Sequence, residues 1–197
     1  MLSKRIIACL DVRDGCVVKG VNFEGLRNAG DPAELAIRYN QEGIDEVVIL
    51  DVTATIEKRK ALADTIHSVA QHIFLPLCVG GGIRDEHHVE AAIEAGADAV
   101  NDVTAMRGDT EMAKVIAEYQ VPVILMFSKD STSPTITLQS DYEDMLYTLK
   151  SFFRERLHFA NSKGVLKIHI VLDQGMGVFQ WCYKIQLYDH QENFKTA

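Results

Sequence analysis

Two aspartates follow apolar runs of the sequence and are the first candidates for chemistry. Asp11 ends the run "KRIIACLD", and Asp51 ends the run "DEVVILD". A carboxylate at the end of a buried strand can take up and return a proton when a substrate lies within hydrogen-bond reach. A single aspartate there can equally cap the sheet or pair with a neighbour, but two on one rim favour a site.

Glycines and a lysine suggest an anion site. The stretch "VGGGIRD" (79–85) places Gly81 and Gly82 between an apolar run and a helix, where bare amides can approach a phosphate closely. The same stretch also fits a tight turn without a ligand. Lys19, in "DGCVVKG", can hold an anion from a mobile loop, or it can simply be solvated.

Alternating strands and helices must position these residues. The apolar runs predict strands over 4–12, 45–53, 75–82, 97–102, 121–127 and 166–173. Amphipathic stretches predict helices over 31–43, 57–72, 86–95, 109–119 and 141–164, with a glycine-containing loop before the first helix. This alternation indicates an α/β fold with a parallel sheet covered on both faces.

The strand ends favour a barrel over an open doubly wound sheet. Five predicted strands end in a polar residue or glycine: Asp11, Asp51, Gly80, Asp102 and Asp173. Convergence of many strand ends on one face is typical of a (β/α)8 TIM barrel. Such barrels need about 250 residues. With 197 residues and about six strand-helix units, the chain predicts an incomplete barrel in a single domain, 1–197.

Composition excludes several classes of protein. A formal charge of -8 argues against binding to the nucleic-acid backbone. The four cysteines are scattered, at Cys9, Cys16, Cys78 and Cys182, which fits a reducing cytoplasm better than a disulfide scaffold. No apolar run approaches the roughly 20 residues of a membrane helix. We therefore expect a cytoplasmic protein that binds neither nucleic acid nor a membrane.

Residues 1 to about 98 resemble the cyclase subunit of imidazole glycerol phosphate synthase, from histidine biosynthesis. The matching segments are "KRIIACLDVRDGCVVKGVNFEGLRNAGDPAELA", "GIDEVVILDVTAT" and "LPLCVGGGIRD". The resemblance implies a (β/α)8 barrel that takes ammonia from a glutaminase subunit. It converts a phosphoribulosyl formimino carboxamide ribotide, a sugar phosphate, into imidazole glycerol phosphate and aminoimidazole carboxamide ribotide. No metal or organic cofactor is implied.

The resemblance also assigns roles to residues. It implies that Asp11 is one of two acid-base aspartates, that Lys19 lies over the substrate, and that Gly81 and Gly82 form part of a phosphate site. We group Asp51 with these substrate-binding residues. At the opposite end of the barrel, an ion-paired ring through which ammonia enters and a face toward the glutaminase would include Arg5, Glu46 and Asp98.

The pattern then departs from that family. Ala99 stands where the family has a lysine that completes the entrance ring, and "VNDVTA" replaces an Asn-Thr pair of the phosphate site. Phe127 stands where the second catalytic aspartate is expected. Asp130, three residues later, is the candidate substitute.

Residues from about 97 to 178 instead resemble dihydropteroate synthase and its pterin-binding relatives, which are also (β/α)8 barrels. The matching segments are "AVNDVTAMRGDTEMAKVIAEYQVPVILM", "FFRERLHFANSKG" and "IVLDQGMG". The resemblance implies that Asn101 and Asp173 hydrogen-bond a pterin ring, whereas strand-end residues of these types can also merely cap the sheet. Gln174 stands where that family has proline.

We therefore interpret "AGAD" (95–98) as a seam between two barrels of one architecture, followed by an unassigned tail over 179–197. Three functions follow: the cyclase, which the denser match favours; a pterin-binding transferase of the dihydropteroate synthase type; and an inactive barrel fragment or chimeric gene product.

Overall fold

The structure is a computed structural model that describes residues 4–21, 24–52, 59–128 and 145–175. Asp130 and the tail over 179–197 lie outside the described residues, so the expectations for them stay predictions.

Six parallel strands lie side by side in the order of the chain. They are β1 (Ile7–Arg13), β4 (Glu46–Asp51), β5 (Leu77–Gly80), β6 (Ala99–Asp102), β7 (Val123–Met126) and β8 (Ile170–Asp173). Each overlaps one of the six predicted strands. A short 3-10 helix, Lys167–His169, takes the start of the last predicted strand.

Five helices connect the parallel strands. They are α1 (Pro32–Gln41), α2 (Arg59–Ala70), α3 (Glu86–Glu94), α4 (Met112–Tyr119) and α5 (Met145–Ser162), and each overlaps a predicted helix. Helix α1 begins as the sequence indicates, because the Asp31 carboxylate accepts hydrogen bonds from the Ala33 and Glu34 amides and Pro32 occupies the first turn.

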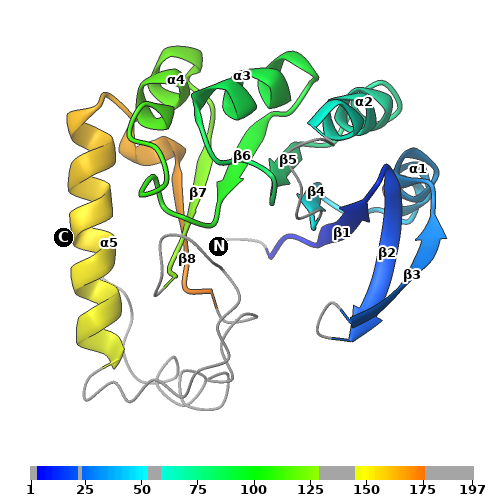
Figure 1. Cartoon of the computed structure of the whole chain (residues 1–197), viewed down its shortest axis with the longest axis horizontal. Helices are drawn as coiled ribbons and strands as arrows, with labels where there is room; N and C mark the ends of the chain where they lie inside the picture. Colours follow the sequence, from blue (N-terminus) through cyan, green and yellow to red (C-terminus); the bar gives the residue numbers. More distant parts are fainter. Residues whose placement is uncertain (1–3, 22–23, 53–58, 129–144, 176–197) are drawn as a thin grey trace.

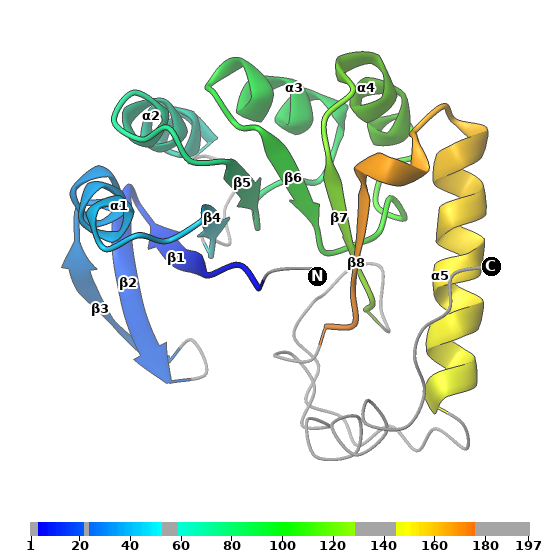
Figure 2. The same ribbon diagram turned by 180° about the vertical axis from the view of Figure 1, so that it is seen from behind.

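The arrangement is of the barrel type. The helices follow one another along the outer side of a curved sheet in both views (Figures 1 and 2). A doubly wound sheet has helices on both faces and a reversal of order among its parallel strands. In the described residues the parallel strands keep the order of the chain, and the antiparallel ribbon of β2 and β3 continues the sheet beyond β1. The sheet is expected to be covered on both faces, and in the described residues helices cover its outer face only. Strands β3 and β8 are the two edges of the sheet, so the barrel is not closed in the described part of the chain.

The core lies between the sheet and the helices. It packs alternate strand residues against the inward stripe of each helix. Among its fully buried members are Val47, Ile49, Val79, Val100 and Leu125 from the strands and Ile66, Val69, Val89, Met112 and Ile116 from the helices. Burying one such side chain stabilises the fold by about 1.5–3 kcal/mol, so this layer fixes the direction of each strand.

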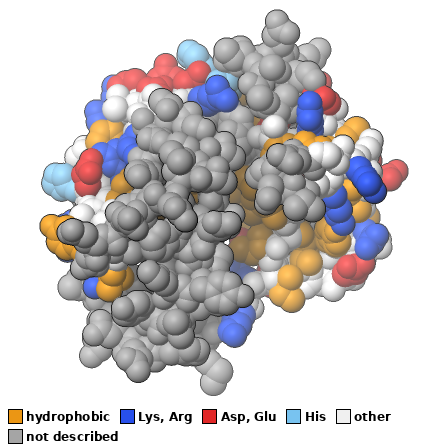
Figure 3. Space-filling view, turned by 60° about the horizontal axis from the view of Figure 1, so that its bottom comes forward, with side chains coloured by type: hydrophobic (Ala, Val, Ile, Leu, Met, Phe, Trp, Pro, Cys, Tyr) orange, Lys and Arg blue, Asp and Glu red, His pale blue; other side chains and the backbone are white. Residues whose placement is uncertain are grey.

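The other face of the parallel strands, here called the inner face, carries the candidate site. By alternation and register it consists of Ile7, Cys9, Asp11, Glu46, Val48, Leu50, Cys78, Gly80, Ala99, Asn101, Ile124, Met126, Val171 and Asp173. Figure 3 shows hydrophobic side chains gathered in a hollow on the side turned away from α2, α3 and α4.

The predicted loop after the first strand is wrong, because two further strands form there. β2 (Cys16–Val21) and β3 (Glu24–Gly30) make an antiparallel ribbon, and Val17 lies opposite Val12 of β1. Asp14 and Gly15 both have positive φ, 55° and 77°, as a two-residue hairpin turn of the Asp-Gly type requires. This turn was visible in the sequence.

No helix among the described residues combines the length and the apolar character needed to cross a membrane.

Candidate functional site

Asp11 lies on the inner face near the end of β1. Its main chain is fixed by the parallel register, in which Asp11 pairs with Leu50 and Val12 with Asp51. Partial burial raises the pKa of the Asp11 carboxyl above its ordinary value. A carboxyl with a raised pKa is easier to protonate near neutral pH, which suits a group that gives and takes protons.

The glycine stretch turns directly against the end of β4. Gly81 has φ 89°, and a methyl group added there would lie 2.8 Å from the carbonyl carbon of Asp51. Only glycine allows this approach at this φ. Gly82 is less crowded, since a methyl group there would lie 3.2 Å from Asp51 Oδ2. The Asp51 carboxylate and the glycine turn are therefore neighbours.

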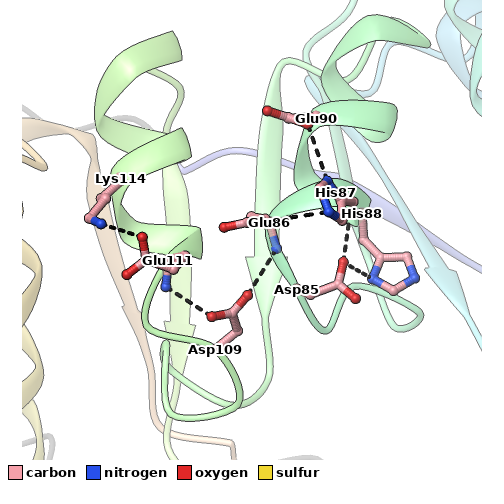
Figure 4. A network of polar contacts seen from close by, with 8 residues as sticks. All are labelled: Asp85, Glu86, His87, His88, Glu90, Asp109, Glu111 and Lys114. Carbon is pink, nitrogen blue, oxygen red and sulfur yellow. Dashed lines mark hydrogen bonds and ion pairs between the residues drawn. The ribbon is translucent and has the colours of Figure 1, made fainter.

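The first turn of α3 already holds acidic side chains (Figure 4). The Asp85 carboxylate accepts a hydrogen bond from the His88 amide at 3.0 Å, and Asp109 accepts one from the Glu86 amide at 3.2 Å. Asp109 also accepts a bond from the Glu111 amide at 2.9 Å, so it links the starts of α3 and α4. An anion at this corner would meet Gly81 and Gly82 rather than the helix itself. In the described part of the chain, these two glycine amides have no protein acceptor.

Asn101 lies next to this turn, on β6. A methyl group added at Gly80 would lie 2.8 Å from Asn101 Cβ and 2.9 Å from its side-chain nitrogen. Asp173 lies on the same face two strands away, because Asn101 pairs with Ile124 and Met126 pairs with Asp173. Its carboxylate accepts a hydrogen bond from the Gly175 amide at 2.8 Å. The structure thus places Asn101 beside the glycines and Asp173 further along the rim.

The carboxylate of Asp102 holds the loop after β6 in place. Asp102 is fully buried and accepts hydrogen bonds from Thr104 N at 2.8 Å, Thr104 Oγ1 at 2.7 Å and Met106 N at 2.5 Å. Burial raises the pKa of Asp102, and these bonds lower it in part. Ala105 and Met106 both have positive φ, 52° and 60°. The amides of Thr104 and Met106 therefore serve Asp102 and cannot also bind a phosphate.

Arg107 ties this loop to the end of β7. Its Nε donates to the Thr104 carbonyl at 3.0 Å and its NH2 donates to the Ser128 carbonyl at 2.6 Å, while the guanidinium stacks over Phe152. Phe127 packs edge-on against Phe152 with ring centroids 4.9 Å apart. Phe127 stands where the second catalytic aspartate of the family is expected. Its side chain packs against α5 and does not face the inner side of the sheet.

A second set of polar side chains lies at the amino ends of the parallel strands, opposite the candidate site. Arg5 and Glu46 form an ion pair. The Asp98 carboxylate accepts a hydrogen bond from the Leu77 amide at 2.9 Å, and Asp45 does the same for Ile6 at 2.6 Å. Both aspartates therefore brace the start of a neighbouring strand. Sequence reasoning missed Asp45, although "GID" and "GAD" share their pattern.

Two thiols of the inner face are kept protonated. Burial, with a smaller contribution from the charge of Asp11, raises the pKa of Cys9 to about 11. Burial, with Glu46 and Cys9, raises the pKa of Cys78 to about 12. Within the described residues, no group of three or more His, Cys, Asp or Glu side chains is arranged to hold a metal ion.

Lys19 lies in β2 rather than in a loop. It is exposed and pairs across the ribbon with Arg27, a residue that sequence reasoning did not single out. The structure therefore brings Asp51 beside Gly81 and Gly82 and places Asn101 beside Gly80. Lys19 lies on the ribbon that begins beside β1.

Curated relatives match the N-terminal part of the chain. The imidazole glycerol phosphate synthase subunit HisF of Thermococcus onnurineus is 49% identical over 118 residues, which cover 60% of this chain and 47% of that protein. HisF of Cytophaga hutchinsonii is 57% identical over 101 residues, covering 51% and 40%. The chain thus spans about half the length of the curated relatives it matches.

Solved structures match almost the whole fold. Dihydropteroate synthase from Xanthomonas albilineans in complex with 7,8-dihydropteroate superposes with a TM-score of 0.72 at 23% identity, over 94% of this chain and 66% of that one. At this identity the likeness shows the fold alone, and it agrees with a TIM-barrel type.

A family model described as histidine biosynthesis protein matches residues 5–148. This match includes β1 to β7 and covers well over half of the chain. The chain therefore belongs to the histidine biosynthesis protein family.

Proposed function

We propose that this chain carries the activity of its HisF relatives, the cyclase reaction of imidazole glycerol phosphate synthase. The observation that carries the proposal is the position of Asp11: a half-buried carboxyl with a raised pKa, on the inner face of a family member, beside the strand that ends in Asp51. In this reaction Asp11 would move protons as ammonia adds to the substrate and the imidazole ring closes.

The glycine turn would hold one phosphate of the substrate. Gly81 and Gly82 offer amides without side chains, and no acceptor among the described residues occupies them. Asp51 Oδ2 lies close to Gly82, so its charge would repel a phosphate dianion that came directly to it. Asp51 therefore suits a sugar hydroxyl next to that phosphate and would accept a hydrogen bond from it.

Ammonia and a partner belong to the opposite end of the sheet. The HisF relatives are subunits of a synthase, and we propose a glutaminase as the partner of this chain. The ion pair of Arg5 and Glu46 would stand at the ammonia entrance, and Asp98 would lie near the partner. Ala99 stands where the family would supply a lysine at this entrance. We therefore expect looser control of ammonia than in relatives that have the lysine.

Ligand-induced thermal stabilisation tests the proposal. A ligand at 100 times its dissociation constant adds about 2.7 kcal/mol to the free energy of unfolding. We expect imidazole glycerol phosphate to raise the melting temperature of the full chain. We also expect Gly82→Val, which places a branched side chain over the amides, to remove the effect. A response to neither imidazole glycerol phosphate nor a pterin would indicate an inactive fragment.

A pterin-binding transferase is the second candidate. Asn101 beside Gly80 and Asp173 on the same face offer an amide and a carboxylate, the groups that satisfy the donors and acceptors of a heterocycle. Stabilisation by 7,8-dihydropterin that is lost in Asn101→Ala and Asp173→Asn, without a response to the sugar phosphate, would select this function instead.

A further inference from the structure

Strand β8 is an apolar edge of the sheet. It pairs with β7 on one side, and in the described part of the chain no strand pairs with its other side. Both views show it at the end of the sheet away from the β2–β3 ribbon (Figures 1 and 2). Its first three residues are Ile170, Val171 and Leu172, and Val171 is 54% exposed. An open edge with exposed apolar side chains is a site of unwanted pairing and aggregation, so we expect it to be covered.

The opposite edge of the sheet, β3, is protected in another way. It carries Glu24 and Arg27, and its pairing with β2 contains two register shifts. Charged side chains and bulges both keep an open edge from pairing with another chain. The stretch Ile170–Leu172 of β8 has no charged residue, and its register with β7 has no shift. Of the two edges, β8 is therefore the one that needs a partner strand.

The chain begins a turn as it leaves β8. The Asp173 carboxylate accepts a hydrogen bond from the Gly175 amide at 2.8 Å, and Gly175 has φ 69°. A carboxylate bound to the amide two residues later and a glycine with positive φ are both typical of turns. Gly177 follows, so the connection over 174–178 contains two glycines. Hairpin connections of two to five residues are common, and this one would let an antiparallel strand begin at residue 179.

The sequence after this connection alternates like a strand with one buried face. Apolar residues recur at every second position, with polar residues or cysteine between them: Phe179, Trp181, Tyr183, Ile185 and Leu187 alternate with Gln180, Cys182, Lys184 and Gln186. Strict alternation is the pattern of a half-buried strand, and aromatic and β-branched residues favour strands. This stretch, 179–187, is here called the alternating segment. It lies outside the described residues, and its pattern is the one that an apolar edge requires.

We propose that the alternating segment pairs antiparallel with β8 and covers its open edge. A connection over 174–178 makes Asp173 and Phe179 the first pair, so that Trp181 would lie directly opposite Val171. The apolar row would then lie on the inner face, where Val171 is the neighbour of Ile124. Directly opposite residues have Cβ atoms about 4.5–5.5 Å apart, so the indole ring would cover the exposed side of Val171.

The connection favours this occupant over a second copy of the chain. A segment tethered through a short linker is present at an effective concentration on the order of millimolar, and it reaches the edge of its own β8 first. β8 has four residues, so the pairing would take up 179–182. The rest of the segment would continue past Leu166 and Ile168, which are 48% and 85% exposed. The proposal does not depend on the cyclase activity.

Trp181 is the only tryptophan of the chain, so its fluorescence reports on the proposed contact. The emission of the full chain and its quenching by acrylamide are compared with those of the chain in denaturant. We expect blue-shifted emission and weaker quenching in the folded wild type, and the loss of both in Val171→Asp. Because Val171 is 54% exposed, this variant should still fold, which far-UV circular dichroism checks. In the wild type, hydrogen exchange should be slower at the amides of 179–182 than at those of 190–197.

Phe74→Asp is the matched control, because it places the same charge at an apolar residue that is fully exposed and lies before β5. It should keep the blue-shifted emission. Wild-type emission like that of the denatured chain, an unchanged signal in Val171→Asp, or equal loss in both variants would overturn the proposal. A blue shift that grows with protein concentration, together with a dimer in size-exclusion chromatography, would identify a second copy as the occupant and would overturn it as well.

Discussion

The main chain of Asp51 packs directly against the α-carbon of Gly81, at a φ of 89° that glycine tolerates and other residues resist. The contact joins the end of β4 to the turn after β5, and so brings the Asp51 carboxylate beside the amides proposed to hold phosphate. The first prediction follows from it.

Gly81→Ala should destabilise the fold strongly, whereas Gly82→Ala should not. A methyl group at Gly81 would lie 2.8 Å from the Asp51 carbonyl carbon, within main chain that cannot move away. At Gly82 the nearest atom is a side-chain oxygen at 3.2 Å, which can rotate. Chemical denaturation should show a loss of at least about 2 kcal/mol for Gly81→Ala. Equal stability of the two variants would show that the turn is not packed as described.

Asp98→Ala should cost more stability than Asp45→Ala, although both remove a carboxylate that accepts a main-chain hydrogen bond. The amide that Asp98 serves belongs to Leu77, which is 1% exposed, whereas Asp45 serves Ile6, which is 64% exposed. Water can replace Asp45 but not Asp98, and an unsatisfied buried donor costs about 1–3 kcal/mol. Urea denaturation of the two variants gives the comparison; the reverse order would refute this account of the strand starts.

Cys9 and Cys78 should be alkylated slowly in the folded protein, Cys78 because it is buried and Cys9, whose side chain is exposed, because its pKa is raised. Raising the pKa of Cys9 from 9.0 to about 11 lowers its thiolate fraction at pH 8 by about 100-fold. The experiment uses a Cys16→Ser, Cys182→Ser variant and compares labelling by iodoacetamide with and without denaturant. Labelling of the native protein at the rate of the unfolded chain would contradict the raised pKa values of these thiols.

Asp11→Asn should leave the fold at least as stable at neutral pH. The folded-state pKa of Asp11 is raised, so the native state binds its proton more tightly than the unfolded state. Its contribution to stability is therefore greatest in acid and declines as pH rises from about 4, the ordinary aspartate value, through the raised pKa. The difference in unfolding free energy between wild type and Asp11→Asn, measured from pH 3 to pH 7, should shift in favour of the variant. A shift in the opposite direction would contradict the raised pKa.

The sequence predicts the parallel strands and their helices because apolar runs and amphipathic stretches are local signals. The β2–β3 ribbon was missed because the glycines at 15, 20 and 25 suggested a loop, while Asp14 and Gly15 in fact form the hairpin turn. The partnership of Lys19 and Arg27 depends on that ribbon and was lost with it.

The sequence did not predict which residues of neighbouring strands come into contact at the site. The approach of Asp51 to Gly81 and of Asn101 to Gly80 depends on how neighbouring strands align. Asp102 was recognised only as a strand end, whereas burial and three hydrogen bonds make it the anchor of the next loop. Across 95–98 the chain passes from α3 into β6 in register with β5, as a seam between two barrels requires, although its origin stays a hypothesis.

Steady-state turnover with ammonium as the nitrogen source, in wild type and in Asp11→Asn, tests the central claim most directly. The account predicts that the full chain forms imidazole glycerol phosphate without a glutaminase, and that Asp11→Asn abolishes this turnover while the substrate still raises its melting temperature. Undiminished turnover in Asp11→Asn, or no turnover in the wild type under conditions where the substrate binds, would contradict it.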